Sequence, residues 1–420
     1  MAKEEKKAPK LRFNGYTNDW ERKKLGILIT RVKSYPLSRS VEVKKETDVK
    51  YVHYGDIHTN IADEIDKNNN LPFINEIYKE YDELKLDDVI VADASEDYKG
   101  IADAAVIISN LPYTIIAGLH TIALRPTSLI KGYFLYHIFK TENFKRFGYK
   151  IGTGLKVFGI SYNNLAKYKV YYPQEIEEQE KIIGILSNLT NSINLHERKC
   201  EELALIKKAL LQNLFPKKDE IKPEVRYKNF SDAWEQRKFF DNIEKVIDFR
   251  GRTPKKLGMK WSNEGYVALS ALNVKDGYID FTADVHYANK ALYDKWMVGN
   301  DLYKGQVLFT TEAPMGNVAQ IPDNQKYVLS QRTIAFDVFR NKITNDFLAV
   351  LLRSQNVQHK LKSLASGGTA QGVSQKSLSQ LKVTVPTRIN EQQKIGEFFK
   401  QLDSLIALHQ RKPKYISKLT

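Results

Sequence analysis

The chain has 420 residues, of which 42% are hydrophobic and 11% aromatic, and its formal net charge is +15. This length favours two or three folded domains, and the apolar content excludes a wholly disordered chain. No apolar run reaches the roughly 18 to 20 residues of a membrane-spanning helix, and the charged first ten residues do not form a signal peptide, so we expect a cytoplasmic protein. The positive charge favours a polyanionic partner such as nucleic acid, although a lysine-rich surface that only maintains solubility fits the charge equally well.

The first recognisable motif follows a short N-terminal segment and occurs twice. LRFNGYTNDWERKKLG begins at Leu11, and RYKNFSDAWEQRKFF begins at Arg226. Each copy has an arginine next to an aromatic residue and then a Trp-Glu pair, and Trp20 and Trp234 are 214 residues apart. A repeat at this spacing predicts a tandem duplication.

Each copy of the motif is followed by short apolar runs that are broken by Gly, Pro, Asn and Asp. The runs predict strands at Val89–Ala92, Ala104–Ile108, Thr121–Leu124, Tyr266–Leu269, Val307–Thr310, Arg332–Phe336 and Leu381–Val385, and a further run at Lys169–Tyr171 is too short to rank. Helices are expected at Leu129–Phe139 and Thr344–Arg353. HTIAL at His120 matches RTIAF at Arg332, and FGISYNNLAKYKV at Phe158 matches QGVSQKSLSQLKV at Gln371. Two related mixed α/β domains are therefore predicted.

A long amphipathic helix is predicted from Tyr172 to Phe215, and a second from Pro386 repeats its pattern. Their apolar positions alternate by four and three residues, as in a coiled-coil seam. The seam positions are Ile182, Leu186, Leu189, Ile193, His196, Cys200, Leu203, Lys207, Leu210 and Leu214 in the first helix, and Ile395, Phe399, Leu402, Ile406 and His409 in the second. If the two ends of each domain lie close together, the helices must run antiparallel. Pro413 falls on the second seam, so that helix is expected to kink there or to end near Lys412.

These elements predict an α+β fold in which two mixed α/β domains are joined by two long antiparallel coiled-coil helices, with pseudo-two-fold symmetry from the duplication. The predicted divisions are a flexible N-terminus (1–13), a first domain (14–171), a central helix and linker (172–225), a second domain (226–385) and a C-terminal helix (386–420).

PQEIEEQEKIIGILSNL, PTRINEQQKIGEFFKQLD and the doubled Trp-Glu segments resemble the specificity subunits of type I restriction-modification systems. The resemblance implies that each domain is a target-recognition domain that reads one half of a split, asymmetric site in double-stranded DNA. It also implies that two methyltransferase subunits dock on the helices and that restriction/translocase subunits join them. S-adenosylmethionine, Mg and ATP would then bind in those partner subunits, and no cofactor in this chain.

The candidate DNA-contact residues lie in two matched glycine-containing loops and one basic turn. Glycines allow close approach of a backbone, and the loops lead to Ser161 and Ser374, each a candidate N-cap of a short helix. Arginine and lysine suit guanine edges or phosphates, and asparagine and glutamine suit adenine. For any single residue, a solvated basic loop is an equally good interpretation. The candidates are Lys150, Thr153, Lys156, Ser161, Asn163, Arg250, Arg252, Thr253, Lys255, Lys256, Thr369, Gln371, Ser374 and Lys376.

Several motifs of catalytic type are better explained as ordinary structure. Asn110-Leu111-Pro112-Tyr113 has the form of a methyltransferase tetrapeptide, but no glycine-rich cofactor loop precedes it, so a turn is expected. Asp88 with Asp97 and Lys99 imitates a nuclease site, but the second domain has no equivalent. Scattered histidines and the single Cys200 predict no metal site, and His196 and His409 are expected to form a polar layer that fixes helix register. The sequence therefore favours a non-catalytic subunit, and a self-contained methyltransferase or nuclease and a coiled-coil scaffold remain the alternatives.

Overall fold

The computed structural model of the chain describes residues 9–75, 80–96, 100–154, 158–217, 220–366 and 371–416. The chain divides into two compact units, Met1–Ser192 and Ile193–Thr420. Among the described residues, no helix combines the length and apolar character that a membrane crossing requires.

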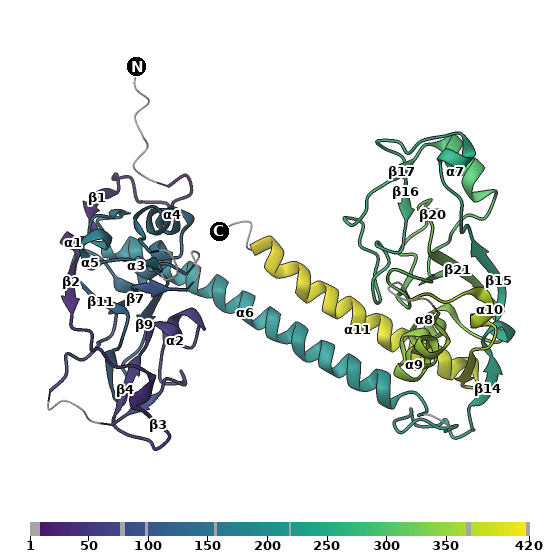
Figure 1. Ribbon diagram of the computed structural model, residues 1–420, viewed down its shortest axis with the longest axis horizontal. Helices are drawn as coiled ribbons and strands as arrows, with labels where there is room; N and C mark the ends of the chain where they lie inside the picture. The colour runs from purple at the N-terminus through teal and green to yellow at the C-terminus, as the bar shows by residue number, and fades with distance from the viewer. Residues whose placement is uncertain are drawn as a thin grey trace. The chain divides into compact units, whose positions relative to one another are not determined.

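The first unit contains a five-stranded sheet, a four-stranded sheet, two two-stranded sheets and the start of a long helix (Figure 1). Its elements in chain order are β1 (Glu21–Lys24), α1 (Leu25–Leu28), β2 (Ile29–Val32), η1 (Arg39–Val41), β3 (Glu42–Val43), β4 (Val49–Val52), α2 (Tyr54–His58), β5 (Glu64–Ile65), β6 (Phe73–Ile74), β7 (Val89–Ala92), β8 (Ala94–Ser95), β9 (Ala104–Ile107), β10 (Thr114–Ala117), β11 (Thr121–Pro126), α3 (Gly132–Phe139), α4 (Glu142–Ile151), β12 (Phe158–Gly159), α5 (Tyr162–Leu165), β13 (Lys169–Tyr172) and α6 (Ile176–Asn213).

The second unit contains the end of α6 and a further set of strands and helices. These are β14 (Glu235–Lys238), η2 (Phe239–Asn242), β15 (Ile243–Asp248), η3 (Lys255–Leu257), β16 (Tyr266–Leu269), β17 (Tyr287–Ala288), α7 (Lys290–Met297), β18 (Val307–Thr310), β19 (Val318–Gln320), β20 (Val328–Leu329), β21 (Thr333–Val338), α8 (Asn345–Arg353), α9 (Gln355–Leu364), α10 (Gln375–Leu378), β22 (Lys382–Val385) and α11 (Ile389–Ile416).

The two units share one topology. The order β2-β11-β7-β9-β5 in the first unit corresponds to β15-β21-β18-β19 in the second, and the connected strands in both are antiparallel along that shared part. In the second sheet of each unit, β4 pairs parallel with β10 and β16 pairs parallel with β20. A two-stranded antiparallel pair, β1 with β13 and β14 with β22, closes each unit near the start of its long helix. The predicted duplication of a mixed α/β fold is therefore confirmed.

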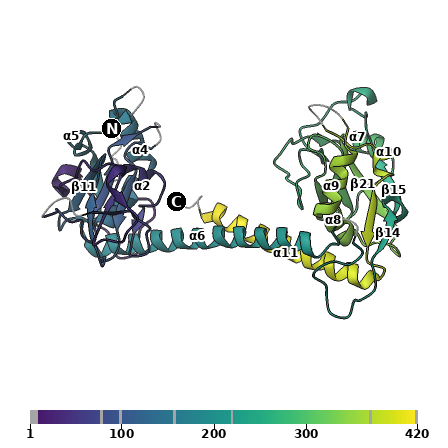
Figure 2. The ribbon, with the colours of Figure 1, turned by 60° about the horizontal axis from the view of Figure 1, so that its bottom comes forward.

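The central strands form because their sequences are apolar on both faces. VIVA in β7 and VLFT in β18 are buried at every position, which is typical of strands that are covered on both sides. Helix α8 packs on β18 and β19 in the second unit, and α3 packs on β7 and β9 in the first. In the second unit, α8 and α9 lie beside β21 (Figure 2). The predictions for these strands and helices were confirmed to within a few residues, whereas α4, α7 and α9 were not predicted.

An arginine from the start of each repeat is locked to a glutamate in the first turn of its long helix. Arg12 donates through Nε and Nη2 to Glu178 at 2.7 and 2.8 Å, and the Trp20 indole lies 3.4 Å from the same carboxylate. Arg226 makes the same two bonds to Glu391. Both glutamates are almost completely buried. The repeated motif thus fixes the direction in which each helix leaves its domain.

The glutamine that follows each buried glutamate is completely buried as well. The Gln179 amide donates to the carbonyls of Pro173 and Leu129, and its oxygen accepts from the Lys131 amide at 2.8 Å. Gln392 binds Pro386, Lys342 and Thr344 in the same way. Both glutamines therefore join the helix to the loop that precedes α3 or α8.

The antiparallel pairing of the two long helices is confirmed within the second unit. Lys207 contacts Asp403 at 2.8 Å, Cys200 lies 3.8 Å from the Ile406 carbonyl, and His196 contacts His409. The residue numbers increase along one helix as they decrease along the other, so the helices are antiparallel (Figure 1). The expected end near Lys412 was wrong, because α11 continues through Pro413 to Ile416. The alternative of a kink at Pro413 stays a prediction.

The predicted first helix is longer than the observed one at both ends, because residues at each end are used in a strand or in a domain core. Tyr172 completes β13 instead of starting a helix, and α6 begins at Ile176. At the other end, Leu214 and Phe215 follow the helix and are buried in the core of the second unit, where Phe215 lies edge-on to Trp234 at 5.9 Å.

Candidate nucleic-acid interface

The predicted glycine loops are matched in the structure. Thr153 and Gly159 exchange two backbone hydrogen bonds of 3.1 and 2.8 Å, and Ser366 and Gly372 exchange two of 3.0 Å. Each loop is thereby closed at its base. Lys150, which was expected in the first loop, is instead an exposed residue in the last turn of α4. Lys156 and Thr369 lie outside the described residues.

Both predicted N-caps are confirmed. The Ser161 hydroxyl accepts from the Asn164 amide at 3.3 Å, and the Ser374 hydroxyl accepts from the Ser377 amide at 3.0 Å. The other candidates in these segments, Thr153, Asn163, Gln371 and Lys376, are exposed.

The two short helices that these serines cap lie beside matched strands. Arg31 of β2 lies over the Tyr162 ring at 5.4 Å. The Gln375 amide donates to Asp248 at the end of β15 at 2.8 Å. Strands β2 and β15 thus bring different side chains to the matched residues Tyr162 and Gln375.

The basic turn of the second unit contains residues of two kinds. Arg250, Lys255 and Lys256 are exposed, and Lys256 donates to the Gly251 carbonyl at 2.8 Å. Arg252 is half-buried, because its guanidinium donates to the Trp296 carbonyl and lies 4.5 Å from the Phe249 ring centroid. The structure therefore presents the first three to solvent and uses Arg252 to hold the turn on α7.

A cavity of about 280 Å³ lies beside this turn. Its lining includes Arg252 and Thr253, which the sequence analysis selected, together with Trp261, His286, Gln331 and Arg332. The Gln331 amide donates to the Arg252 carbonyl at 2.6 Å, so the turn and the β20–β21 connection are tied together. Aromatic faces next to arginine are well suited to contact with nucleotides.

Two residues that the sequence analysis did not select, His120 and Arg332, occupy matched positions. They directly precede β11 and β21, and each has a left-handed backbone, with φ of 57° for His120 and 65° for Arg332. The only sequence signal was the match between HTIAL and RTIAF.

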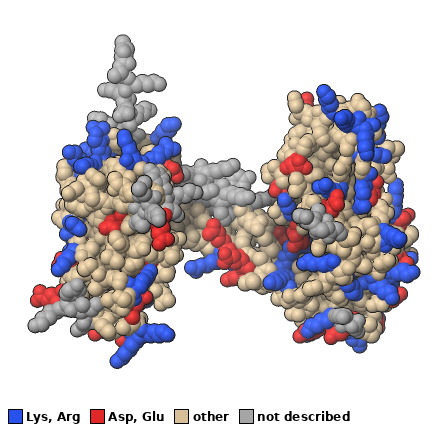
Figure 3. Space-filling model, in the orientation of Figure 1, with Lys and Arg blue, Asp and Glu red and all other residues tan. Residues whose placement is uncertain are grey.

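Lysine and arginine side chains are spread over both units on the face drawn in Figure 3, with acidic side chains between them. The positive charge on this face is therefore not collected into one patch, and local geometry must select the contact residues.

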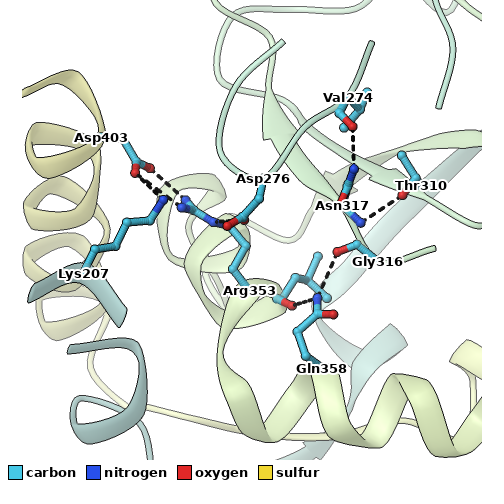
Figure 4. A network of polar contacts seen from close by, with 10 residues as sticks. Lys207, Val274, Asp276, Thr310, Gly316, Asn317, Arg353, Gln358 and Asp403 are labelled. Carbon is cyan, nitrogen blue, oxygen red and sulfur yellow. Dashed lines mark hydrogen bonds and ion pairs between the residues drawn. The ribbon is translucent and has the colours of Figure 1, made fainter. Parts of the chain in front are cut away.

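A polar network in the second unit joins the mixed α/β domain to the paired helices (Figure 4). The Arg353 side chain is only 5% exposed and contacts Asp276 at 2.7 Å and Asp403 at 2.8 Å. Asp403 also pairs with Lys207 of α6. Burial alone would lower the pKa of Arg353, but the two carboxylates outweigh it and raise that pKa above its usual value. The network therefore ties α8, α11 and α6 together through ion pairs.

The predicted seam residues contact two kinds of surface. Ile182 packs against the core of the first unit, and Ile395 and Phe399 are part of the core of the second. His196 and His409 face each other across the helix pair, with 2.8 Å between their Nδ1 atoms. The 3.5-residue pattern predicted burial correctly, but the partner of each residue depends on its distance from the domain.

The motifs of catalytic type are occupied by structural contacts where the structure describes them. Asp88 accepts two hydrogen bonds from Arg125, at 2.9 and 2.6 Å. Asn110 to Tyr113 lie in the connection between β9 and β10. Asp97 and Lys99 lie outside the described residues. Within the described parts of the chain, no group of three or more His, Cys, Asp or Glu side chains is arranged to hold a metal ion.

The sequence matches the family described as type I restriction modification DNA specificity domain twice, over residues 17–205 and 232–418. The chain belongs to this family. Each match contains one recognition domain and the long helix that follows it, which is included up to residue 205 in α6 and completely in α11. The family domain is therefore the structural repeat described above.

Two known proteins are similar to this chain, one in sequence and one in structure. The type I restriction enzyme MjaVIII specificity subunit of Methanocaldococcus jannaschii is 26% identical over 255 residues, which cover 58% of this chain and 57% of that protein. The chain thus aligns with little more than half the length of this curated relative. The crystal structure of the type I restriction-modification system S subunit from M. genitalium covers 98% of this chain and 96% of its own, with a TM-score of 0.58 and 13% identity. At that identity, the structural match supports the fold.

Proposed function

We propose that this chain is the DNA-recognition subunit of a type I restriction-modification complex. Each target-recognition domain reads one half of a split, asymmetric site in double-stranded DNA. The observation that carries this proposal is the presence of two family domains with one topology and different surface residues at matched positions. A shared framework with different contact residues is the arrangement expected for reading two different half-sites.

The chemistry belongs to partner subunits in this proposal. Two methyltransferase subunits, docked on the long helices, bind S-adenosylmethionine, and restriction/translocase subunits use Mg and ATP. This chain binds none of these cofactors and is not itself an enzyme. The family description, which names DNA specificity and no catalytic activity, supports this division.

A selection experiment tests the proposal. The full chain, assembled with methyltransferase subunits, is incubated with a library of randomised DNA duplexes, and the bound fraction is sequenced. We expect a consensus of two short half-sites separated by unread base pairs. A bound fraction without sequence preference would instead favour a coiled-coil scaffold.

The same preparation distinguishes the enzyme alternative. The chain alone, incubated with duplex DNA and labelled S-adenosylmethionine or with Mg, is expected neither to transfer methyl groups nor to cut. Either activity in the chain alone contradicts the proposed division of labour.

A further inference from the structure

The turn before β11 and the turn before β21 present one exposed side chain each in the same local geometry. The His120 carbonyl accepts from the Asp93 amide at 3.0 Å, and the Arg332 carbonyl accepts from the Thr311 amide at 2.8 Å. Asp93 and Thr311 each follow the neighbouring strand, β7 or β18. We infer that His120 and Arg332 are the matched base-reading positions of the two domains, an inference that rests on the proposed function.

A carboxylate holds the Arg332 side chain at Nε and leaves the two terminal Nη groups available to contact a base. Arg332 forms an ion pair with Glu312, with 2.8 Å between Nε and Oε1, and the arginine side chain is 54% exposed. Among the described residues, the terminal Nη groups have no hydrogen-bond partner. An arginine oriented through Nε presents two parallel N–H donors, which is the geometry that reads the O6 and N7 atoms of guanine.

His120 is held in the same manner by a different pair of atoms. Its Nδ1 lies 3.1 Å from Asp93 Oδ1, and the histidine side chain is 49% exposed. In the tautomer whose Nδ1–H group donates a hydrogen bond to the carboxylate, Nε2 is an acceptor. An acceptor suits the amino group of adenine or cytosine in the major groove, so the two matched positions select different bases.

The surroundings of both residues fit contact with bases. Arg332 lines the cavity that contains Trp261 and His286. His120 lies edge-on to the Tyr54 ring, at 5.3 Å between centroids. An aromatic ring therefore lies in the same cavity lining as Arg332 and in edge contact with His120.

Stability does not explain these two residues. Exposed ion pairs contribute little to folding, and a left-handed backbone at a residue other than glycine destabilises the native state. Strained residues of this kind are concentrated at functional sites. Because the strain is repeated in both domains at exposed, carboxylate-held side chains, it indicates a function that both domains share.

The test uses the full chain assembled with methyltransferase subunits and randomised duplexes. In Arg332→Ala we expect the preference for guanine to fall by roughly ten- to hundredfold at one position of one half-site, while the other half-site is unchanged. Arg332→Gln should shift that position towards adenine. His120→Ala should relax one position in the opposite half-site.

Arg340→Ala is the matched control. Arg340 is an exposed arginine just beyond the other end of β21, so its removal changes the net charge equally without touching the turn. It should keep every base preference. Arg332→Lys tests the fork separately, because lysine keeps the charge but cannot make the paired contact, and it should relax the same position.

Two results would overturn the inference. One is an Arg332→Ala consensus identical to that of the wild type. The other is a uniform loss of affinity at all sequences, which indicates a phosphate contact. A wild-type complex without any consensus would overturn the proposed function as well, so the two failures are distinguishable. An unchanged thermal midpoint of each variant shows that the fold is intact.

Discussion

Arg226 and Glu391 form a two-bond ion pair, with distances of 2.7 and 2.8 Å, between the start of the second repeat and the first turn of its long helix. The Trp234 indole donates to the same carboxylate at 3.3 Å. Arg12, Trp20 and Glu178 repeat the arrangement in the first unit. The duplication therefore preserves the joint between domain and helix while the surfaces differ.

Replacing Arg226 with alanine leaves a buried carboxylate with one remaining donor. We expect this to lower the free energy of unfolding by about 3 kcal/mol, since removing one partner of a buried pair leaves an uncompensated charge. Arg388→Ala is the control, because its pair with Asp232 is exposed, and its loss should stay below about 1 kcal/mol. Urea denaturation measures the free energy of unfolding of both variants. Equal losses would contradict the stabilising role of the Arg226–Glu391 ion pair.

Gln392→Ala removes the side chain that satisfies three backbone groups around the start of α11. Each buried group left without a partner costs about 1 to 3 kcal/mol, so a loss of about 3 kcal/mol or more is expected. The exposed neighbour Gln393 gives the control Gln393→Ala, which should be nearly neutral. A stable Gln392→Ala protein would show that the joint does not depend on this glutamine.

His137 of α3 predicts a pH dependence. Burial, with a smaller contribution from Lys140, lowers its pKa from 6.5 to about 4. Between these values the unfolded chain binds a proton that the folded chain does not, so His137 makes stability fall as the pH falls through this window. Thermal midpoints of His137→Phe should decline less steeply than those of the wild type.

His137→Gln separates titration from packing in the same series. Glutamine keeps polarity but does not titrate, so it should flatten the pH profile as well. A midpoint that rises equally at every pH in the phenylalanine variant alone would show improved packing against Tyr133, whose ring stacks on His137 at 4.9 Å. A profile that neither variant flattens would contradict the role of His137.

Exchanging residues 14–170 for the corresponding domain of another family member should change one half of the DNA target. The other half should remain, because the Arg226–Glu391 joint and the second domain are untouched. Sequencing of methylated DNA from cells that carry the hybrid complex measures this. A change in both halves would contradict independent reading by the two domains.

Two heptads inserted after His196 in α6 and before His409 in α11, both between the histidine pair and the second domain, keep the antiparallel register and should lengthen the unread gap. Fourteen helical residues add about 21 Å, or about six base pairs at 3.4 Å per pair. Both half-sites should stay the same in a duplex selection. Insertion in α6 alone is the control, because it breaks the His196–His409 register and should weaken assembly.

The sequence by itself determined the duplication, the mixed α/β class of each unit and the family. These features depend on local patterns that survive divergence, such as apolar strands, the Trp-Glu motif and the glutamines at matched positions. Cap residues Ser161 and Ser374 were predictable for the same reason, because capping involves only neighbouring amides.

Tertiary structure alone decided which residues share a surface. Nothing in the sequence places Glu312 against Arg332 or Asp93 against His120, because these contacts arise from strand pairing across 20 or more residues. The same holds for the long helices. The periodicity predicted which helix residues are buried, but it did not predict which residues they contact. Ile395 and Phe399 face the domain core and His409 faces His196, since the surface opposite each residue is supplied by another part of the chain.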